Sequence, residues 1–155
     1  MDSPCDTRHH AWPLFLKTHS LLVDRLDAGL QAATGLPLTW FDVLVHVAGA
    51  PHQRVRMNEL AESLLLSKSG ITRLVDRMVS AKLITRSSCA SDRRVVYANL
   101  TTRGRAVFNE AAPVAARGVQ EHFASYLGLE EERVLVAVLS RIIDGQTCAP
   151  ARSAG

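Results

Sequence analysis

This sequence has few aromatic residues and no long apolar run. Aromatic residues make up 5% of its 155 residues, so a core has to be built mainly from Leu, Val, Ala and Ile. No apolar stretch approaches the roughly 18 residues that span a bilayer, and we expect no membrane contact. The first apolar stretch, residues 11–16, is too short for a signal peptide, and Asp2 and Asp6 lie where such a peptide is basic.

Cysteine is scarce as well. Three cysteines, Cys5, Cys89 and Cys148, are far apart and odd in number. This spacing argues against a disulfide framework and favours a reduced, cytoplasmic setting. The six histidines show no local ligand spacing, and the chain has no Gly-rich phosphate loop and no nucleophile elbow. We therefore expect no metal site, no cofactor and no enzymatic activity.

The charge is distributed unevenly along the chain. Between Arg54 and Arg105 there are eleven Lys and Arg against four Asp and Glu, a balance of +7. The rest of the chain holds seven against eleven, a balance of −4. A basic middle between acidic ends favours a module that binds a polyanion. A chance cluster of basic residues is the alternative.

The two ends of the chain show helical periodicity. Apolar residues recur at steps of three and four from residue 11 to about 33, and Gly35 and Pro37 end this helix. A second long helix begins at Thr101 and extends to about Tyr126, with Pro113 predicted to kink or split it. A last helix follows Gly128. Residues 1–10 are expected to form a flexible arm and residues 146–155 a flexible tail.

The middle of the chain contains three shorter helices and a hairpin. Thr39 is predicted to cap a helix over residues 40–48, Asn58 the next helix, and Ser67 a further one. Residues 54–57 are too few for more than a short strand or a bend. Residues 83–86 and 95–100 are rich in β-prone residues, and the polar segment 87–94 between them predicts a hairpin with a long loop.

The helix after Ser67 has two distinct faces. Ile71, Leu74, Val75 and Met78 fall on one face, while Ser, Thr and Arg fall on the other. Such a helix, followed by a hairpin, is what a winged helix-turn-helix requires for the major groove of DNA. The predicted DNA-binding residues are Ser67, Lys68, Ser69, Thr72, Arg73, Arg77, Asp92, Arg93 and Arg94. In the alternative interpretation, Arg73 and Arg77 are ordinary solvated residues that pair with Asp76 or Glu62.

Several segments resemble the MarR family of bacterial transcription regulators. They are residues 57–62 (MNELAE), 66–78 (LSKSGITRLVDRM), 83–86 (LITR), 92–94 (DRR) and 100–104 (LTTRG). The order of elements matches from about residue 11 to 144. One departure is Lys82, where the family usually has the Gly that ends the helix in a left-handed conformation. Lys82 therefore either adopts that strained conformation or the helix ends differently.

The resemblance implies a mainly α fold with a small β-hairpin wing. Residues 37–100 would form the winged helix-turn-helix domain, and residues 11–36 and 101–145 a helical dimerisation region. It also implies a homodimer that binds a palindromic double-stranded DNA operator as a repressor. In this family, Asp92 would brace the wing arginines and Arg94 would enter the minor groove. The dimer interface would include Leu135, Val138, Leu139 and Ile142.

Many relatives release DNA when they bind a small, often phenolic, ligand. The candidate lining here is Trp12, Phe15, His19, Trp40, Val43, Leu44 and Val47. His19 lies on an apolar helix face, where it would bind an acidic ligand or change charge with pH; an ordinary core or interface histidine is the alternative. Oxidation of Cys5, Cys89 or Cys148 is a rival signal. A winged domain that binds protein instead of DNA is a third possibility.

Overall fold

The computed structural model describes residues 10–89, 92 and 94–147. Cys5, Arg93 and Cys148 lie outside the described residues, as do most of the predicted arm and tail. The fold is mainly α-helical with one small sheet, which confirms the predicted fold class. The elements are α1 (Ala11–Thr34), α2 (Leu38–Gly49), η1 (Pro51–Gln53), β1 (Arg54–Arg56), α3 (Met57–Ser63), α4 (Lys68–Ser80), β2 (Ile84–Ser88), β3 (Val96–Leu100), α5 (Thr102–His122), η2 (Ala124–Tyr126) and α6 (Leu129–Thr147).

The sheet has three antiparallel strands in the order β1-β3-β2. The segment after η1, which the sequence left open as a strand or a bend, is therefore the edge strand β1. Its Val55 pairs with Ala98 of β3, and Arg86 of β2 pairs with the same residue from the other side. Ala98 and Ile84 are fully buried, so one face of the sheet covers the core.

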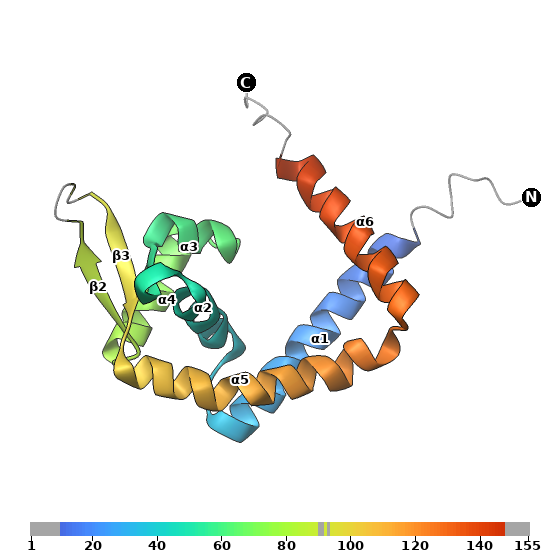
Figure 1. The fold of residues 1–155 in the computed structure, drawn as a ribbon, viewed down its shortest axis with the longest axis horizontal. Helices are drawn as coiled ribbons and strands as arrows, with labels where there is room; N and C mark the ends of the chain where they lie inside the picture. The colour runs from blue at the N-terminus through green and yellow to red at the C-terminus, as the bar shows by residue number, and fades with distance from the viewer. Residues whose placement is uncertain (1–9, 90–91, 93, 148–155) are drawn as a thin grey trace, which may run out of the picture.

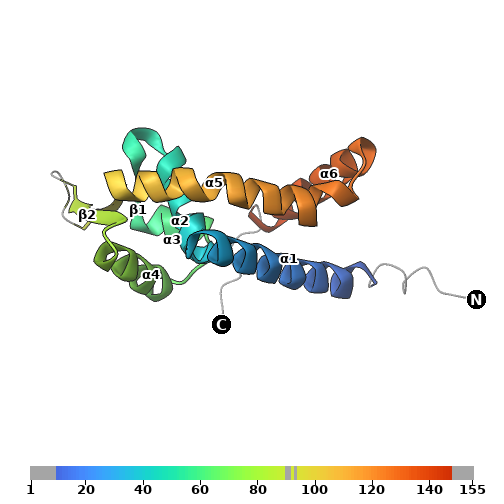
Figure 2. The same cartoon turned by 90° about the horizontal axis from the view of Figure 1, so that it is seen from below.

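We call the segment from α2 to β3, residues 38–100, the winged part of the chain. The core lies in this part. It gathers apolar side chains from α2, α3, α4 and the sheet, with Leu30 from the end of α1 and Ala111 from the middle of α5. α5 leaves the winged part and packs beside α1, as both views show (Figures 1 and 2). α6 lies at the far end of these two helices. From here on, α1, α5 and α6 together are called the arm, a name that does not include the predicted flexible segment 1–10. None of the described helices is both long and apolar enough to cross a membrane.

Two of the four predicted helix starts are confirmed. Ser67 Oγ accepts a hydrogen bond from the N–H of Gly70 at 3.0 Å, and Thr101 Oγ1 accepts one from Gly104 at 2.8 Å. These side chains satisfy backbone donors that the first turn of a helix leaves unpaired.

The predicted caps at Thr39 and Asn58 are wrong. α2 begins at Leu38 after Pro37, and the Leu38 N–H donates to Asp27 Oδ1 of α1 at 2.7 Å. A carboxylate eleven residues away thus replaces the local cap. α3 begins at Met57, directly after β1, with Arg56 at the cap position and no side-chain hydrogen bond there. Pairing of β1 with β3 fixes where that helix begins.

Two further expectations concern helix interiors and ends. Pro113 was predicted to kink or split this helix, and α5 continues through Pro113 as one element, so the split is not observed. The helix ends at His122 rather than Tyr126. Pro113 cannot bond the carbonyl of Asn109, but Asn109 is exposed and water can satisfy that oxygen. Lys82 adopts a left-handed conformation with φ of 62°. The first of the two alternatives for Lys82 is therefore correct.

Candidate nucleic-acid interface

α4 presents a continuous polar face to solvent. Its apolar residues Ile71, Leu74, Val75 and Met78 are buried, as their spacing predicted. The six predicted contact residues on this helix are all exposed: Ser67, Lys68, Ser69, Thr72, Arg73 and Arg77. The Ser67 cap lies at the N-terminus, where free N–H groups and the helix dipole favour an anion. The face therefore offers hydroxyl, ammonium and guanidinium donors to a negatively charged partner.

The alternative pairing of the α4 arginines is not observed. Asp76 forms an ion pair with Arg86 of β2, with 2.7 Å between Oδ1 and Nη1. Across the described part of the chain, neither Arg73 nor Arg77 forms an ion pair. Their charges are therefore available to a partner.

The wing tip is shaped by Asp92. Its Oδ1 accepts a hydrogen bond from the backbone N–H of Arg94 at 2.9 Å. This is the local turn that an Asp side chain favours. Asp92 and Arg94 are both exposed. The carboxylate therefore fixes the backbone position from which the side chain of the predicted wing arginine, Arg94, extends.

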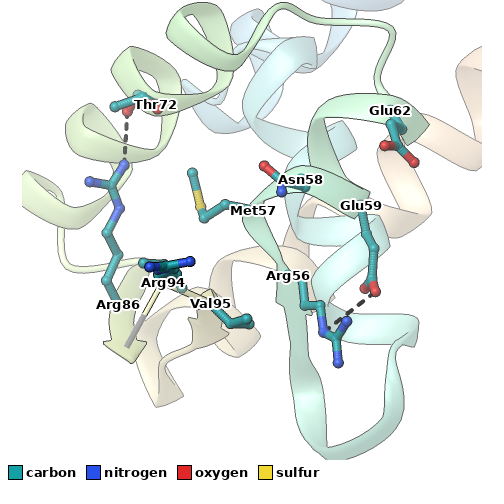
Figure 3. Close-up of a pocket in the computed structure, with 10 residues that line it drawn as sticks. Arg56, Met57, Asn58, Glu59, Glu62, Thr72, Arg86, Arg94 and Val95 are labelled. Carbon is teal, nitrogen blue, oxygen red and sulfur yellow. Dashed lines mark hydrogen bonds and ion pairs between the residues drawn. The ribbon is translucent and has the colours of Figure 1, made fainter. Parts of the chain in front are cut away.

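A polar cleft lies between α3, α4 and the wing. Figure 3 shows Thr72 above Arg86, with Arg94 beside them and Met57 and Asn58 across the opening. The cleft has a volume of about 350 Å³, and its lining comes from Arg56, Met57, Asn58, Glu59, Glu62, Thr72, Arg86, Arg94, Val95 and Val96. It brings the recognition-helix residue Thr72 and the wing residue Arg94 to one opening.

Sequence reasoning missed a basic cluster on β1. Arg54 and Arg56 pair in register with Asn99 and Tyr97 of β3. The Arg54 guanidinium lies 4.8 Å from the centre of the Tyr97 ring, and Arg56 Nε donates to the Tyr97 hydroxyl at 3.3 Å. That hydrogen bond, followed by the nearby Glu59 carboxylate, raises the pKa of Arg56. Arg56 and Tyr97 are 41 residues apart in the sequence, and the pairing of β1 with β3 brings them together. No local sequence motif predicts this contact.

The base of the wing is attached closely to the start of α5. The Thr101 hydroxyl donates to the carbonyl of Lys82 at 2.8 Å, and the Thr101 N–H donates to that of Leu83 at 3.1 Å. Gly104 lies against the Leu83 carbonyl so closely that any side chain there would overlap it. α4 and the wing, the elements predicted to bind DNA, are thus joined directly to α5.

The residues predicted to line an effector pocket are not brought together. Val43, Leu44 and Val47 are core residues without exposed surface, so they cannot line an open pocket in this protomer. Trp12, Phe15 and His19 lie exposed on α1, while Trp40 is half-buried against the core. The end of α1 shares the core with α2 through Leu30, whereas Trp12, Phe15 and His19 lie nearer the start of α1 and are exposed.

The predicted dimer-interface residues lie along α6. Leu135, Val138 and Leu139 are half-buried and Ile142 is exposed. Within the described residues, α6 packs extensively against no other element. Figure 1 shows it projecting from the end of the arm.

The remaining candidates are Cys89, as a site of oxidation, and clusters of metal-ligating side chains. Cys89 is half-buried where the wing loop begins, and its N–H donates to the Val95 carbonyl. In the described ranges, no three His, Cys, Asp or Glu side chains are placed to hold a metal ion.

Comparisons with known proteins agree with this geometry. A family model described as the MarR family matches residues 34–95. The chain is 29% identical over 101 residues to the transcriptional regulator MhqR of Bacillus subtilis. The matched segment covers 65% of this chain and 66% of MhqR, so it spans slightly less than two thirds of MhqR.

Two solved structures from Streptomyces coelicolor resemble nearly the whole chain. AbsC, a MarR family transcriptional regulator, is 31% identical with a TM-score of 0.87, and the match covers 96% of this chain and 100% of AbsC. Sco3205, a MarR family regulator crystallised in complex with DNA, is 28% identical with a TM-score of 0.85, covering 95% of this chain and 91% of Sco3205.

Proposed function

This chain belongs to the MarR family, and from that premise we propose that it is a homodimeric transcriptional repressor that binds a palindromic DNA operator. One observation carries the proposal. The exposed face of α4 carries Lys68, Arg73 and Arg77. Thr72 on the same helix lines one cleft with Arg94 of the wing. We infer that α4 enters the major groove and Arg94 the adjacent minor groove, so that one subunit recognises one half of the palindrome.

The surface of the arm supports the dimer. α6 leaves Val134, Val136, Ile142 and Ile143 exposed, and α1 does the same with Trp12. A helix without packing partners is marginally stable in water, because most helix stability in proteins comes from burial of an apolar face. A second copy of the arm would cover these surfaces and place two α4 helices about one turn of DNA apart.

We also propose that a small aromatic ligand releases the protein from DNA. The described protomer exposes Trp12, Phe15 and His19 on α1 without a cavity behind them. A ligand site that includes them therefore needs the partner subunit to close it. In this view the ligand changes the spacing of the two α4 helices rather than blocking one of them.

The proposal is tested by selecting genomic DNA fragments that the purified protein binds. We expect recovery of a palindrome, and its affinity should fall by about 10³-fold or more between 50 and 200 mM salt if each dimer makes about six or more phosphate contacts. Addition of small aromatic acids to the complex tests the effector. Recovery of no common sequence contradicts DNA-directed repression and favours a protein partner.

A further inference from the structure

Arg86 connects the wing to the recognition helix. It lies on β2, and its guanidinium donates from Nη2 to the carbonyl of Thr72 at 3.0 Å and forms an ion pair from Nη1 with Asp76 at 2.7 Å. Thr72 and Asp76 are four residues apart and lie on adjacent turns of α4. One planar group thus holds two successive turns of that helix. Figure 3 shows the contact with Thr72.

The fork geometry of arginine suits this role. Two donors that point in fixed directions restrict both the distance and the angle between β2 and α4. The Arg86 side chain is only 30% exposed, so its bonds compete less with water than those of a fully exposed pair. A lysine has no second nitrogen with which to make both contacts.

The acceptors also limit what Arg86 offers to DNA. The Asp76 carboxylate neutralises its charge, and both terminal nitrogens are engaged within the protein. By contrast, Arg94 is exposed at the wing, and its backbone is ordered by Asp92. The two arginines line one cleft but have different surroundings.

We propose that Arg86 is a positioning residue that fixes the angle of the wing against α4, so that Arg94 reaches the minor groove while α4 occupies the major groove. This inference rests on the proposed function. It assigns to Arg86 an effect on DNA affinity that acts through Arg94 rather than through its own contact with DNA.

A double-mutant cycle tests the inference on the selected palindrome. Arg86→Ala is expected to weaken binding about tenfold in the wild-type background and to have almost no effect in the Arg94→Ala background, because coupled residues are not additive. Asp76→Asn should reproduce part of the loss, and Arg86→Lys should not restore affinity. Arg103→Ala is the control, since Arg103 is an exposed charge on α5 that forms no ion pair within the described residues.

Two footprints separate positioning from general destabilisation: hydroxyl radicals, which attack the sugars, report the minor groove at the wing, and methylation of guanine N7 reports the major groove at α4. Arg86→Ala should lose protection at the wing and keep protection at α4. If Arg86→Ala lowers the melting temperature, Asp76→Asn provides the same test with a side chain of equal size. Equal losses of affinity in both backgrounds, or uniform loss of protection, would overturn the inference. Wild-type protein that binds no DNA would instead overturn the proposed function, and the inference with it.

Discussion

The winged part and the arm differ in how far their apolar side chains are buried. In the winged part, Leu44, Leu60 and Met78 have no exposed surface. Along the arm, Trp12 of α1 is 62% exposed and Ile143 of α6 is 61% exposed. The comparison teaches that the winged part buries its own apolar side chains, whereas the described residues of one chain leave apolar side chains of the arm exposed. This is the pattern expected of an obligate dimer.

The largest expected effect is on the arm. Ile142→Asp should separate the proposed dimer, because burial of an unpaired carboxylate in an apolar interface costs several kcal/mol. We expect the dimer dissociation constant to rise at least about 100-fold, given about 1.4 kcal/mol for each tenfold change. Sedimentation velocity measures it. Ala137→Asp, at an exposed position on the side of α6 that carries Arg133 and Arg141, is the matched control. An unchanged dimer in Ile142→Asp would show that the interface lies elsewhere.

The next effect concerns the winged part alone. Arg94→Ala should weaken operator binding by about 1–3 kcal/mol, the usual cost of losing a specific groove contact. The dimer and its thermal stability should not change, because Arg94 is exposed and far from α6. Fluorescence anisotropy at physiological salt measures the affinity. Wild-type affinity in this variant would remove the wing from the interface.

A smaller effect is expected where the backbone is strained. Lys82 has φ of 62° at the end of α4 and an exposed side chain. Lys82→Gly should raise the free energy of unfolding by about 0.5–1 kcal/mol, because glycine adopts this conformation without steric cost. Lys82→Ala keeps the strain and should give no such gain. Urea unfolding compares the two variants, and equal stability would show that the strain is relieved elsewhere.

The smallest effect is a dependence of stability on pH. Partial burial raises the pKa of the Asp42 carboxyl, and the nearby His46 opposes that shift. In the pH range between the unfolded and the folded pKa, the native state binds more protons, so stability falls as pH rises through this range. Asp42→Asn should therefore stabilise the protein at pH 7, by less than about 1 kcal/mol since the group remains partly hydrated. The gain should vanish below the ordinary pKa of Asp. A gain that persists there would have another cause.

The features that sequence predicted well are local or periodic. The spacing of Ile71, Leu74, Val75 and Met78 predicted which face of α4 is buried, and Ser67 and Thr101 were predicted as helix starts. Each of these depends on residues within one or two turns. Charge balance and the hairpin pattern also predict that the DNA-binding region lies in the middle of the chain, and this stays a prediction.

The features that sequence could not predict depend on long-range contacts. Asp27 replaces the expected Thr39 cap across eleven residues, and Arg86 reaches α4 across fourteen. Periodicity showed that α1 and α2 each have an apolar face, but it could not show that Val43 faces the core while Phe15 faces outward. For that reason a single chain does not bring the predicted pocket residues together, and the pocket stays a prediction.

The account is tested most directly by the mass of the protein with and without its operator. Sedimentation equilibrium of the full chain should give two chains in free solution and two chains on each palindrome, with no loss of the winged fold. A folded single chain that binds one half-site with full affinity would contradict the account, because the arm would then need no partner.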